Sequence, residues 1–172
     1  MLANQASDLY MGLDIGSTTV KVVLLDNALN PVFRIYQRHH SDIKATLSHS
    51  IREALLRVGN KTVSALVTGS AGLSAAAWSG LSFIQEVIAG TEAVKHLIPE
   101  TDVAIELGGE DAKITYFSNG IEQRMNGICA GGTGAFIDQM AALLETDAMG
   151  LNCLAAKHKM IYPIAARCGV FA

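Results

Sequence analysis

The stretch that decides the fold is residues 13–21, which read LDIGSTTVK, because a stretch of the same design follows 92 positions later as IELGGEDAK at residues 105–113. In each, an acidic residue ends an apolar strand, one or two glycines turn the chain, and a lysine leads into the next strand. A glycine turn lets backbone N–H groups approach a phosphate closely, because no Cβ blocks the way. Two such turns facing each other would hold a nucleoside triphosphate between two lobes.

Either turn taken alone is also typical of an ordinary β-hairpin, since Asp-x-Gly and Gly-Gly are common in turns. The two stretches, however, are in register with each other and are separated by the length of one small domain. This repetition favours phosphate binding over two unrelated hairpins.

The acidic residues of the two turns are the candidates for catalysis. Asp14 is the candidate for a Mg²⁺–water contact, because Mg²⁺ prefers oxygen ligands. Either Glu106 or Asp111 would orient the attacking water, and the pattern does not choose between them. Phosphoryl transfer to water depends on positioning and charge neutralisation rather than on a covalent nucleophile. The hydroxyls of the first turn are therefore interpreted as hydrogen-bond donors to phosphate rather than as nucleophiles.

The lysines of the two turns have two interpretations. Lys21 either contacts phosphate or is simply solvated at its strand edge, and the sequence favours neither role. Lys113 has less support than Lys21 as a phosphate ligand.

Composition and charge exclude several classes of function. The 172 residues are 50% hydrophobic and carry a net charge of −3 without a long basic run, so nucleic-acid binding has little electrostatic support. The most basic spot, residues 38–40, is explained as a solvated strand end. The apolar stretches are far shorter than the ~20 residues of a membrane span. With no signal-peptide pattern at the N-terminus, a cytoplasmic protein is expected.

Apolar periodicity predicts a mixed α/β order in which a second lobe restarts the topology of the first. We expect lobes at residues 1–100 and 101–172, with mixed sheets flanked by helices. The second copy stops early and the chain ends on an apolar run, which predicts a fragment of a longer protein. The expected elements are two strands within 10–25, a strand at 32–37, a helix capped by Ser41 and ending at 58, a strand at 63–67, a helix at 84–97, strands at 103–105, 114–117 and 121–125, and a helix at 134–144.

Two glycine-flanked cysteine segments connect the chain to a known family. NGICAGGTGAF at residues 126–136 and ARCGVFA at residues 166–172 resemble the activators of 2-hydroxyacyl-CoA dehydratases and the ATPase subunits of benzoyl-CoA reductase, within the actin, sugar kinase and Hsp70 superfamily. The resemblance spans residues 11–172 and implies a ribonuclease H-like, actin-like ATPase fold of duplicated lobes, the second incomplete. It implies that ATP or ADP with Mg²⁺ is bound through phosphate segments containing Gly16, Ser17, Thr18, Thr19, Lys21, Gly108, Gly109 and Glu110.

The same resemblance implies redox chemistry at Cys129 and Cys168. Four thiolates hold a [4Fe–4S] cluster, so two chains in a homodimer would each supply this pair. ATP hydrolysis would then drive transfer of a low-potential electron, drawn from ferredoxin or flavodoxin, to a 2-hydroxyacyl-CoA dehydratase or CoA-ester reductase. Cys153 lacks such a context and is expected to be a small buried apolar residue.

The second turn departs from the family pattern Asp-x-Gly-Gly-Gln-Asp. Glu106 replaces the first Asp, and Glu110 replaces Gln, which changes how Mg²⁺ and the attacking water would sit. The adenosine-binding segment of the family lies further along the chain and is absent from this sequence. Two other functions stay open, a small-molecule kinase of the same superfamily and a nucleotide-sensing, non-redox dimerisation module of a long multidomain protein.

Overall fold

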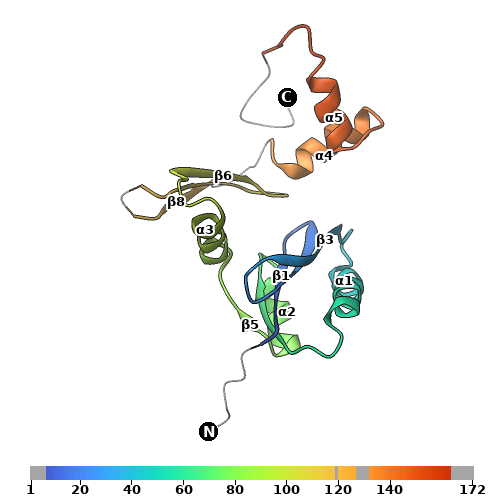
Figure 1. Cartoon of the computed structure of the whole chain (residues 1–172). Helices are drawn as coiled ribbons and strands as arrows, with labels where there is room; N and C mark the ends of the chain where they lie inside the picture. Colours follow the sequence, from blue (N-terminus) through green and yellow to red (C-terminus); the bar gives the residue numbers. More distant parts are fainter. Residues whose placement is uncertain (1–6, 119, 127–131, 164–172) are drawn as a thin grey trace. The chain divides into compact units, whose positions relative to one another are not determined.

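The computed structural model describes residues 7–118, 120–126 and 132–163. The chain divides into two compact units, Met1–Leu97 and Ile98–Ala172. Each unit is built around its own sheet, with strand order β3-β2-β1-β4-β5 in the first and β6-β7-β8 in the second (Figure 1).

The central strand of the first sheet is β1 (Leu9–Ile15), which carries the first acidic residue at its end. It pairs antiparallel with β2 (Thr19–Leu25) and parallel with β4 (Val63–Thr68). The edges are β3 (Pro31–Arg38) and the two-residue β5 (Ser82–Phe83). Because β1 and β4 run parallel, their carboxyl ends lie side by side at the same edge of the sheet.

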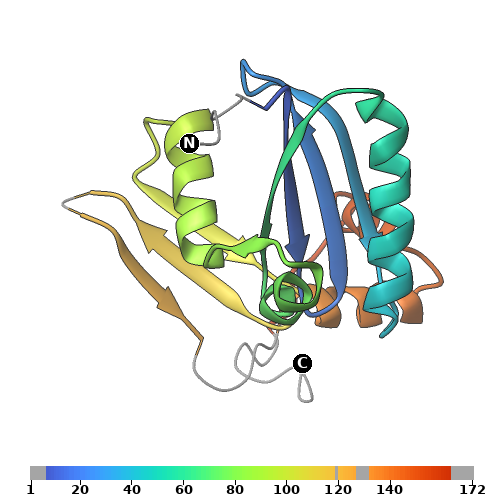
Figure 2. The ribbon, with the colours of Figure 1, turned by 90° about the horizontal axis from the view of Figure 1, so that it is seen from below.

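Helices cover one face of this sheet. Helix α1 (Ile43–Val58) packs on β2 and β3, and α2 (Gly72–Ser79) packs on β1, β4 and β5, while α3 (Glu86–Leu97) follows β5 (Figure 2 shows α1 along the sheet). The buried core between α1, α2 and the sheet includes Leu9, Leu13, Ile15, Val20, Val22, Leu24, Leu47, Ala54, Val67, Ala75 and Ala76. Full burial of one large apolar side chain contributes roughly 1.5–3 kcal/mol to the stability of the fold.

Among the helices of the described residues, none has both the length and the apolar character that a membrane span requires.

The two-residue period of the strands decides which side chains reach the opposite face. The odd-numbered residues of β1 are buried under the helices, so Asp14 lies on the other face. Lys21 stands directly opposite Asp14 in the β1–β2 register and shares that face. The sheet face that α1 and α2 do not cover therefore carries Asp14 and Lys21.

One helix prediction needs correction, and one helix of the first unit was not predicted. The N-cap of α1 is Asp42, whose Oδ1 accepts from the backbone N–H of Ala45 at 3.0 Å, and not Ser41, whose backbone has φ 68°. Helix α2 was not predicted, because its sequence GLSAAAWS lacks an amphipathic period. A left-handed Gly80 ends it.

The second unit begins with an antiparallel sheet of β6 (Val103–Leu107), β7 (Ala112–Tyr116) and β8 (Glu122–Met125). Helices α4 (Gly134–Leu143) and α5 (Ala148–Ala155) follow. The predicted strands and the helix at 134 are confirmed. Helix α5 was not predicted, although the Oδ1 of its N-cap, Asp147, accepts from the backbone N–H of Gly150 at 2.8 Å.

Candidate functional site

The two glycine turns have the same backbone architecture. The N–H of Gly16 donates to the carbonyl of Thr19 at 2.9 Å. At the equivalent positions of the second turn, the N–H of Gly108 donates to the carbonyl of Asp111 at 2.8 Å. The repeat recognised in the sequence is therefore a repeat of the turn geometry as well.

Both turns also place an acidic residue opposite a lysine. Asp14 pairs with Lys21 across β1 and β2, and Glu106 pairs with Lys113 across β6 and β7. The Nζ of Lys21 lies 2.7 Å from Oδ2 of Asp14, whereas the Nζ of Lys113 lies 3.6 Å from Oε1 of Glu106. Turns of equal length thus bring the strand-end carboxylate and its lysine together twice.

The loop after β4 packs against the first turn and is hydrogen-bonded to it. Thr68 is the register partner of Asp14 on the neighbouring parallel strand, and the N–H of Ala71 donates to the carbonyl of Ile15 at 2.9 Å. Gly69, with φ 96°, leaves no room for a side chain, because a Cβ there would touch the Ile15 carbonyl oxygen and lie 2.6 Å from Oδ1 of Asp14. Glycine at this position is therefore what allows the loop to approach the carboxylate.

His39, the residue directly after β3, also supports the first turn. Its side chain is buried, its Nε2 lies 3.3 Å from the carbonyl oxygen of Gly16, and its backbone N–H donates to the carbonyl of Thr18 at 3.2 Å. The N–H of Ser41 donates to Nδ1 of His39, so the tautomer protonated at Nε2 satisfies both ring nitrogens. The prediction of a solvated strand end is wrong for His39, because its ring folds back onto the turn.

The three hydroxyl residues of the first turn differ in access. Ser17 is exposed, Thr18 is half-buried and Thr19 is buried, so the first two have the more accessible hydroxyls. Lys21 is half-exposed, and its Nζ also lies 5.7 Å from the centroid of the Tyr36 ring. Lys21 therefore lies between a carboxylate and an aromatic ring while its side chain keeps contact with solvent.

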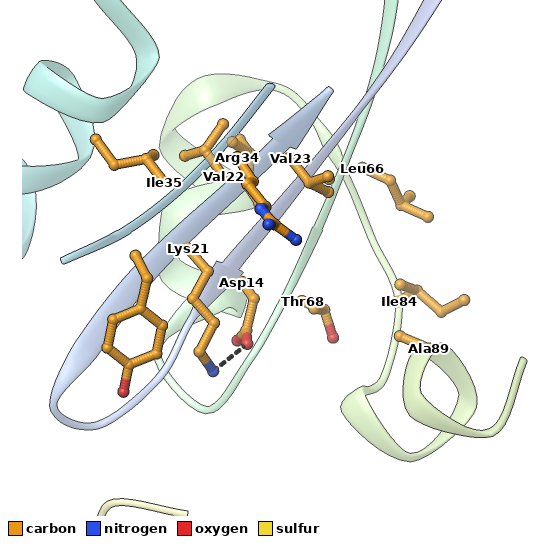
Figure 3. Close-up of a pocket in the computed structure, with 13 residues that line it drawn as sticks. Asp14, Lys21, Val22, Val23, Arg34, Ile35, Leu66, Thr68, Ile84 and Ala89 are labelled. Carbon is orange, nitrogen blue, oxygen red and sulfur yellow. Dashed lines mark hydrogen bonds and ion pairs between the residues drawn. The ribbon is translucent and has the colours of Figure 1, made fainter. Parts of the chain in front are cut away.

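A pocket of about 650 Å³ opens on the sheet face beside the first turn. Figure 3 places Asp14, Lys21 and Thr68 toward one end of it, whereas Arg34 and several apolar side chains line the rest. The lining is Gly12, Leu13, Asp14, Lys21, Val22, Val23, Arg34, Ile35, Tyr36, Leu66, Thr68, Ile84 and Ala89.

The lysine of the second turn is buried, unlike Lys21. The side chain of Lys113 is 8% exposed, and its Nζ lies 3.2 Å from Oδ2 of Asp111 as well as 3.6 Å from Glu106. Both carboxylates keep solvent contact, with side-chain exposures of 40% for Asp111 and 53% for Glu106. Lys113 thus compensates the charge of the two residues that the sequence nominated to orient water, a role that the sequence did not indicate.

Helix α4 begins against the second turn. The N–H of Gly134 donates to the carbonyl of Gly108, and the N–H of Ala135 donates to that of Gly109, both at 2.8 Å. The first turn of a helix carries unsatisfied N–H groups and partial positive charge. The helix start therefore binds the turn directly, while Glu110 between the two strands stays exposed.

The oxygen donors around Asp14 fit a magnesium ion bound mainly through phosphate and water. Mg²⁺ is usually held by one or two carboxylates together with substrate phosphates and several waters. The half-buried Asp14 carboxylate lies beside the Thr68 hydroxyl, a buried oxygen without a hydrogen-bond partner. In the described ranges, no three His, Cys, Asp or Glu side chains converge as they would at a metal centre held by protein alone.

The cysteines predicted to hold a cluster, Cys129 and Cys168, lie outside the described residues. Cys153 lies on α5 and is exposed, so the expectation that it is buried is wrong.

Comparison with known proteins identifies relatives over nearly the whole chain. The model of the BadF/BadG/BcrA/BcrD ATPase family matches residues 11–172. The 2-hydroxyisocaproyl-CoA dehydratase activator of Clostridioides difficile is 31% identical over 179 residues, covering 94% of this chain and 62% of the relative. The (R)-2-hydroxyglutaryl-CoA dehydratase activating ATPase of Acidaminococcus fermentans is 29% identical over 166 residues, covering 94% and 64%. The chain therefore spans less than two thirds of the length of these relatives.

Solved structures confirm the expected fold. The Acidaminococcus fermentans (R)-2-hydroxyglutaryl-CoA dehydratase component A superimposes with a TM-score of 0.83 at 28% identity, over 96% of this chain and 65% of that one. The activator of the 2-hydroxyisocaproyl-CoA dehydratase from Clostridium difficile, solved with bound ADPNP, also gives 0.83, at 29% identity over 95% and 62%. The mixed α/β, actin-like ATPase fold and the resemblance to dehydratase activators are thereby confirmed.

Proposed function

The chain belongs to the BadF/BadG/BcrA/BcrD ATPase family, and on that premise we propose that it binds and hydrolyses ATP to activate a 2-hydroxyacyl-CoA dehydratase or a related CoA-ester reductase. The observation that carries the proposal is the repeated turn, with the same closing hydrogen bond and the same facing acid and lysine in both units. A relative of similar fold was solved with the ATP analogue ADPNP, which supports a nucleotide as the ligand.

In this proposal the first turn binds phosphate and the ion that accompanies it. The backbone at Gly16 and the accessible hydroxyls of Ser17 and Thr18 donate to phosphate oxygens. Asp14 would accept hydrogen bonds from water bound to the ion, and Lys21, whose Nζ lies 2.7 Å from Oδ2 of Asp14, would donate instead to a phosphate oxygen. When bound, Mg²⁺ supplies neutralisation of the phosphate charge that develops during transfer.

The second turn contributes Gly108 and Gly109 to phosphate binding and its acids to the attacking water. Lys113 lies closer to Asp111 than to Glu106, and Glu106 is the more exposed of the two. We therefore assign the water to Glu106 and a positioning role to Asp111. In-line attack requires an oriented water more than a strong base, so a carboxylate with some freedom to reach it suffices.

The redox part of the proposal rests on the sequence around Cys129 and Cys168. Two thiolates from each of two chains would complete the ligand set of a [4Fe–4S] cluster in a homodimer. Ferredoxin or flavodoxin would supply the electron that the activated enzyme receives.

Nucleotide binding and hydrolysis are tested first. Isothermal titration of the chain with ADPNP in the presence of Mg²⁺ should show binding, and ATP should yield inorganic phosphate. Glu106→Gln should lower the hydrolysis rate at least tenfold, about 1.4 kcal/mol in the barrier, with binding retained. Glu100→Gln, which changes an exposed carboxylate in the preceding loop, is the matched control and should hydrolyse ATP normally. Absence of binding by the unmodified chain would refute the proposal.

The cluster is tested separately by iron and acid-labile sulfide analysis after anaerobic reconstitution. We expect about four of each per dimer. Both should be lost in Cys129→Ser and in Cys168→Ser, whereas Cys153→Ser should retain them. A folded dimer that binds nucleotide but takes up no iron would instead support a nucleotide-sensing dimerisation module.

A further inference from the structure

One buried hydroxyl beside the first turn is left unsatisfied. Among the buried side-chain nitrogens and oxygens of the described residues, Oγ1 of Thr68 lacks a hydrogen-bond partner. Burying a hydroxyl without a partner costs free energy, and native structures contain few such groups. Thr115, a threonine of strand β7, does have a hydrogen-bond partner, because its Oγ1 accepts from Nε2 of Gln123 at 3.1 Å. The orphaned oxygen of Thr68 therefore calls for an explanation.

The position of Thr68 supplies one. It is the last residue of β4 and the register partner of Asp14, so the two residues lie on the same sheet face of neighbouring strands, which are about 4.8 Å apart. Both line the pocket beside the first turn, at the end where Lys21 also lies (Figure 3). The unsatisfied hydroxyl of Thr68 thus lies next to Asp14, whose carboxylate is proposed to accept a hydrogen bond from metal-bound water.

The loop that follows fixes the backbone beside Thr68. The left-handed Gly69 packs against Asp14, the N–H of Ala71 donates to the carbonyl of Ile15, and the N–H of Gly72 donates to that of Gly69 at 2.9 Å. A polar group held in place by its neighbours costs less entropy when a ligand binds.

We propose that the Thr68 hydroxyl is a further binding group of the nucleotide site, supplied by a third loop beyond the two glycine turns. It makes a hydrogen bond to an oxygen of the Mg²⁺–nucleotide complex held at Asp14, either a phosphate oxygen or a metal-bound water. This inference rests on the proposed function, because it requires a nucleotide at the first turn. It assigns to residues 68–72 a role that neither glycine turn supplies.

The test compares Thr68→Val, which removes the hydroxyl at constant shape, with Thr68→Ser, which keeps it. The probes are thermal unfolding of the nucleotide-free chain and titration with ADPNP in the presence of Mg²⁺. Thr68→Val should unfold at the same or a higher temperature, because it removes an unsatisfied polar group, and should bind about tenfold more weakly. Thr68→Ser should bind within about twofold of the unmodified chain.

Thr115→Val is the contrasting control. It should unfold at a lower temperature, because the Gln123 amide loses its acceptor, and should bind nucleotide normally. Unchanged affinity in Thr68→Val would overturn the inference alone. So would weaker binding accompanied by a lower unfolding temperature, since the hydroxyl would then be supporting the fold. If the unmodified chain does not bind ADPNP, the proposed function fails first and the inference fails with it.

Discussion

The two glycine turns have the same backbone hydrogen bond but differ in formal charge. The stretch at residues 13–21 is formally neutral, with one acid and one lysine, whereas residues 105–113 carry three acids and one lysine, a formal charge of −2. Lys21 is half-exposed beside an aromatic ring, and Lys113 is buried between two carboxylates. We therefore expect Lys21 to exchange its partner when phosphate binds and Lys113 to remain a counter-charge to its two carboxylates.

The supports of the two turns differ as well. The first turn is braced by the loop after β4 and by His39, and the second by the start of α4. The same local geometry is thus stabilised by unrelated parts of the fold. Three predictions test this comparison and a fourth tests the sheet that carries the first turn, and they run from the largest expected effect to the smallest.

Gly69→Ala should disrupt the contact between the loop after β4 and the first turn. Its Cβ would collide with the Ile15 carbonyl and the Asp14 carboxylate in a backbone conformation that disfavours side chains, so we expect a loss of about 3 kcal/mol or more in unfolding free energy. Gly80→Ala is the matched control, because Gly80 is also left-handed (φ 71°) but has open space around it, and about 1 kcal/mol is expected. Denaturant unfolding measures both, and equal losses would show that the close contact with Asp14 has no energetic weight.

Removal of the counter-charge in the second turn is tested by Lys113→Met. Two carboxylates would lose their shared cation, but because both are partly exposed the expected loss is about 2 kcal/mol, below that of a fully buried pair. Adding Glu106→Gln to the same chain should recover part of the loss, since less charge remains to compensate. Lys44→Met, at an exposed position of α1, serves as the control in the same denaturant titrations.

The first lysine should respond in the opposite way. Lys21→Met is expected to change the free energy of unfolding by less than about 1 kcal/mol, because the pair with Asp14 is half-exposed. Its affinity for ADPNP with Mg²⁺ should fall about tenfold, because a charge-assisted phosphate contact is lost. If Lys21→Met proved as destabilising as Lys113→Met, the distinction between an exchangeable and a fixed lysine would be untenable.

The smallest effect concerns acid stability of the first sheet. The backbone N–H of Thr62, and then its hydroxyl, donate to the carboxylate of Asp8, which lowers the pKa of Asp8 below its usual value of 3.8. Because the folded pKa lies below the unfolded one, this contact stabilises the fold above about pH 4, and the benefit is lost as the pH falls through the folded pKa. Asp8→Asn should therefore flatten the dependence of the unfolding temperature on pH in this acid range. An unchanged slope in Asp8→Asn would contradict this prediction.

Much of the fold was readable from local signals. Helix α1 and the strands around both turns follow from apolar periodicity, because a period of 3.6 or 2 decides which face is buried. Helix α2 escaped prediction, since a short segment of alanines and other small or apolar residues has no polar face to reveal its period. Its helical state follows from packing on the sheet.

The sequence by itself determined the two turns, because their glycines, acids and lysines lie within nine consecutive residues and their hairpin register follows from turn length. Only the tertiary structure decided what surrounds them. Thr68 reaches Asp14 through a parallel crossover across 54 positions, and His39 reaches Gly16 across 23. Lys113 becomes a buried counter-charge only when its strand is packed. Such contacts leave no periodic trace in the sequence, because they depend on the pairing of segments far apart in the chain.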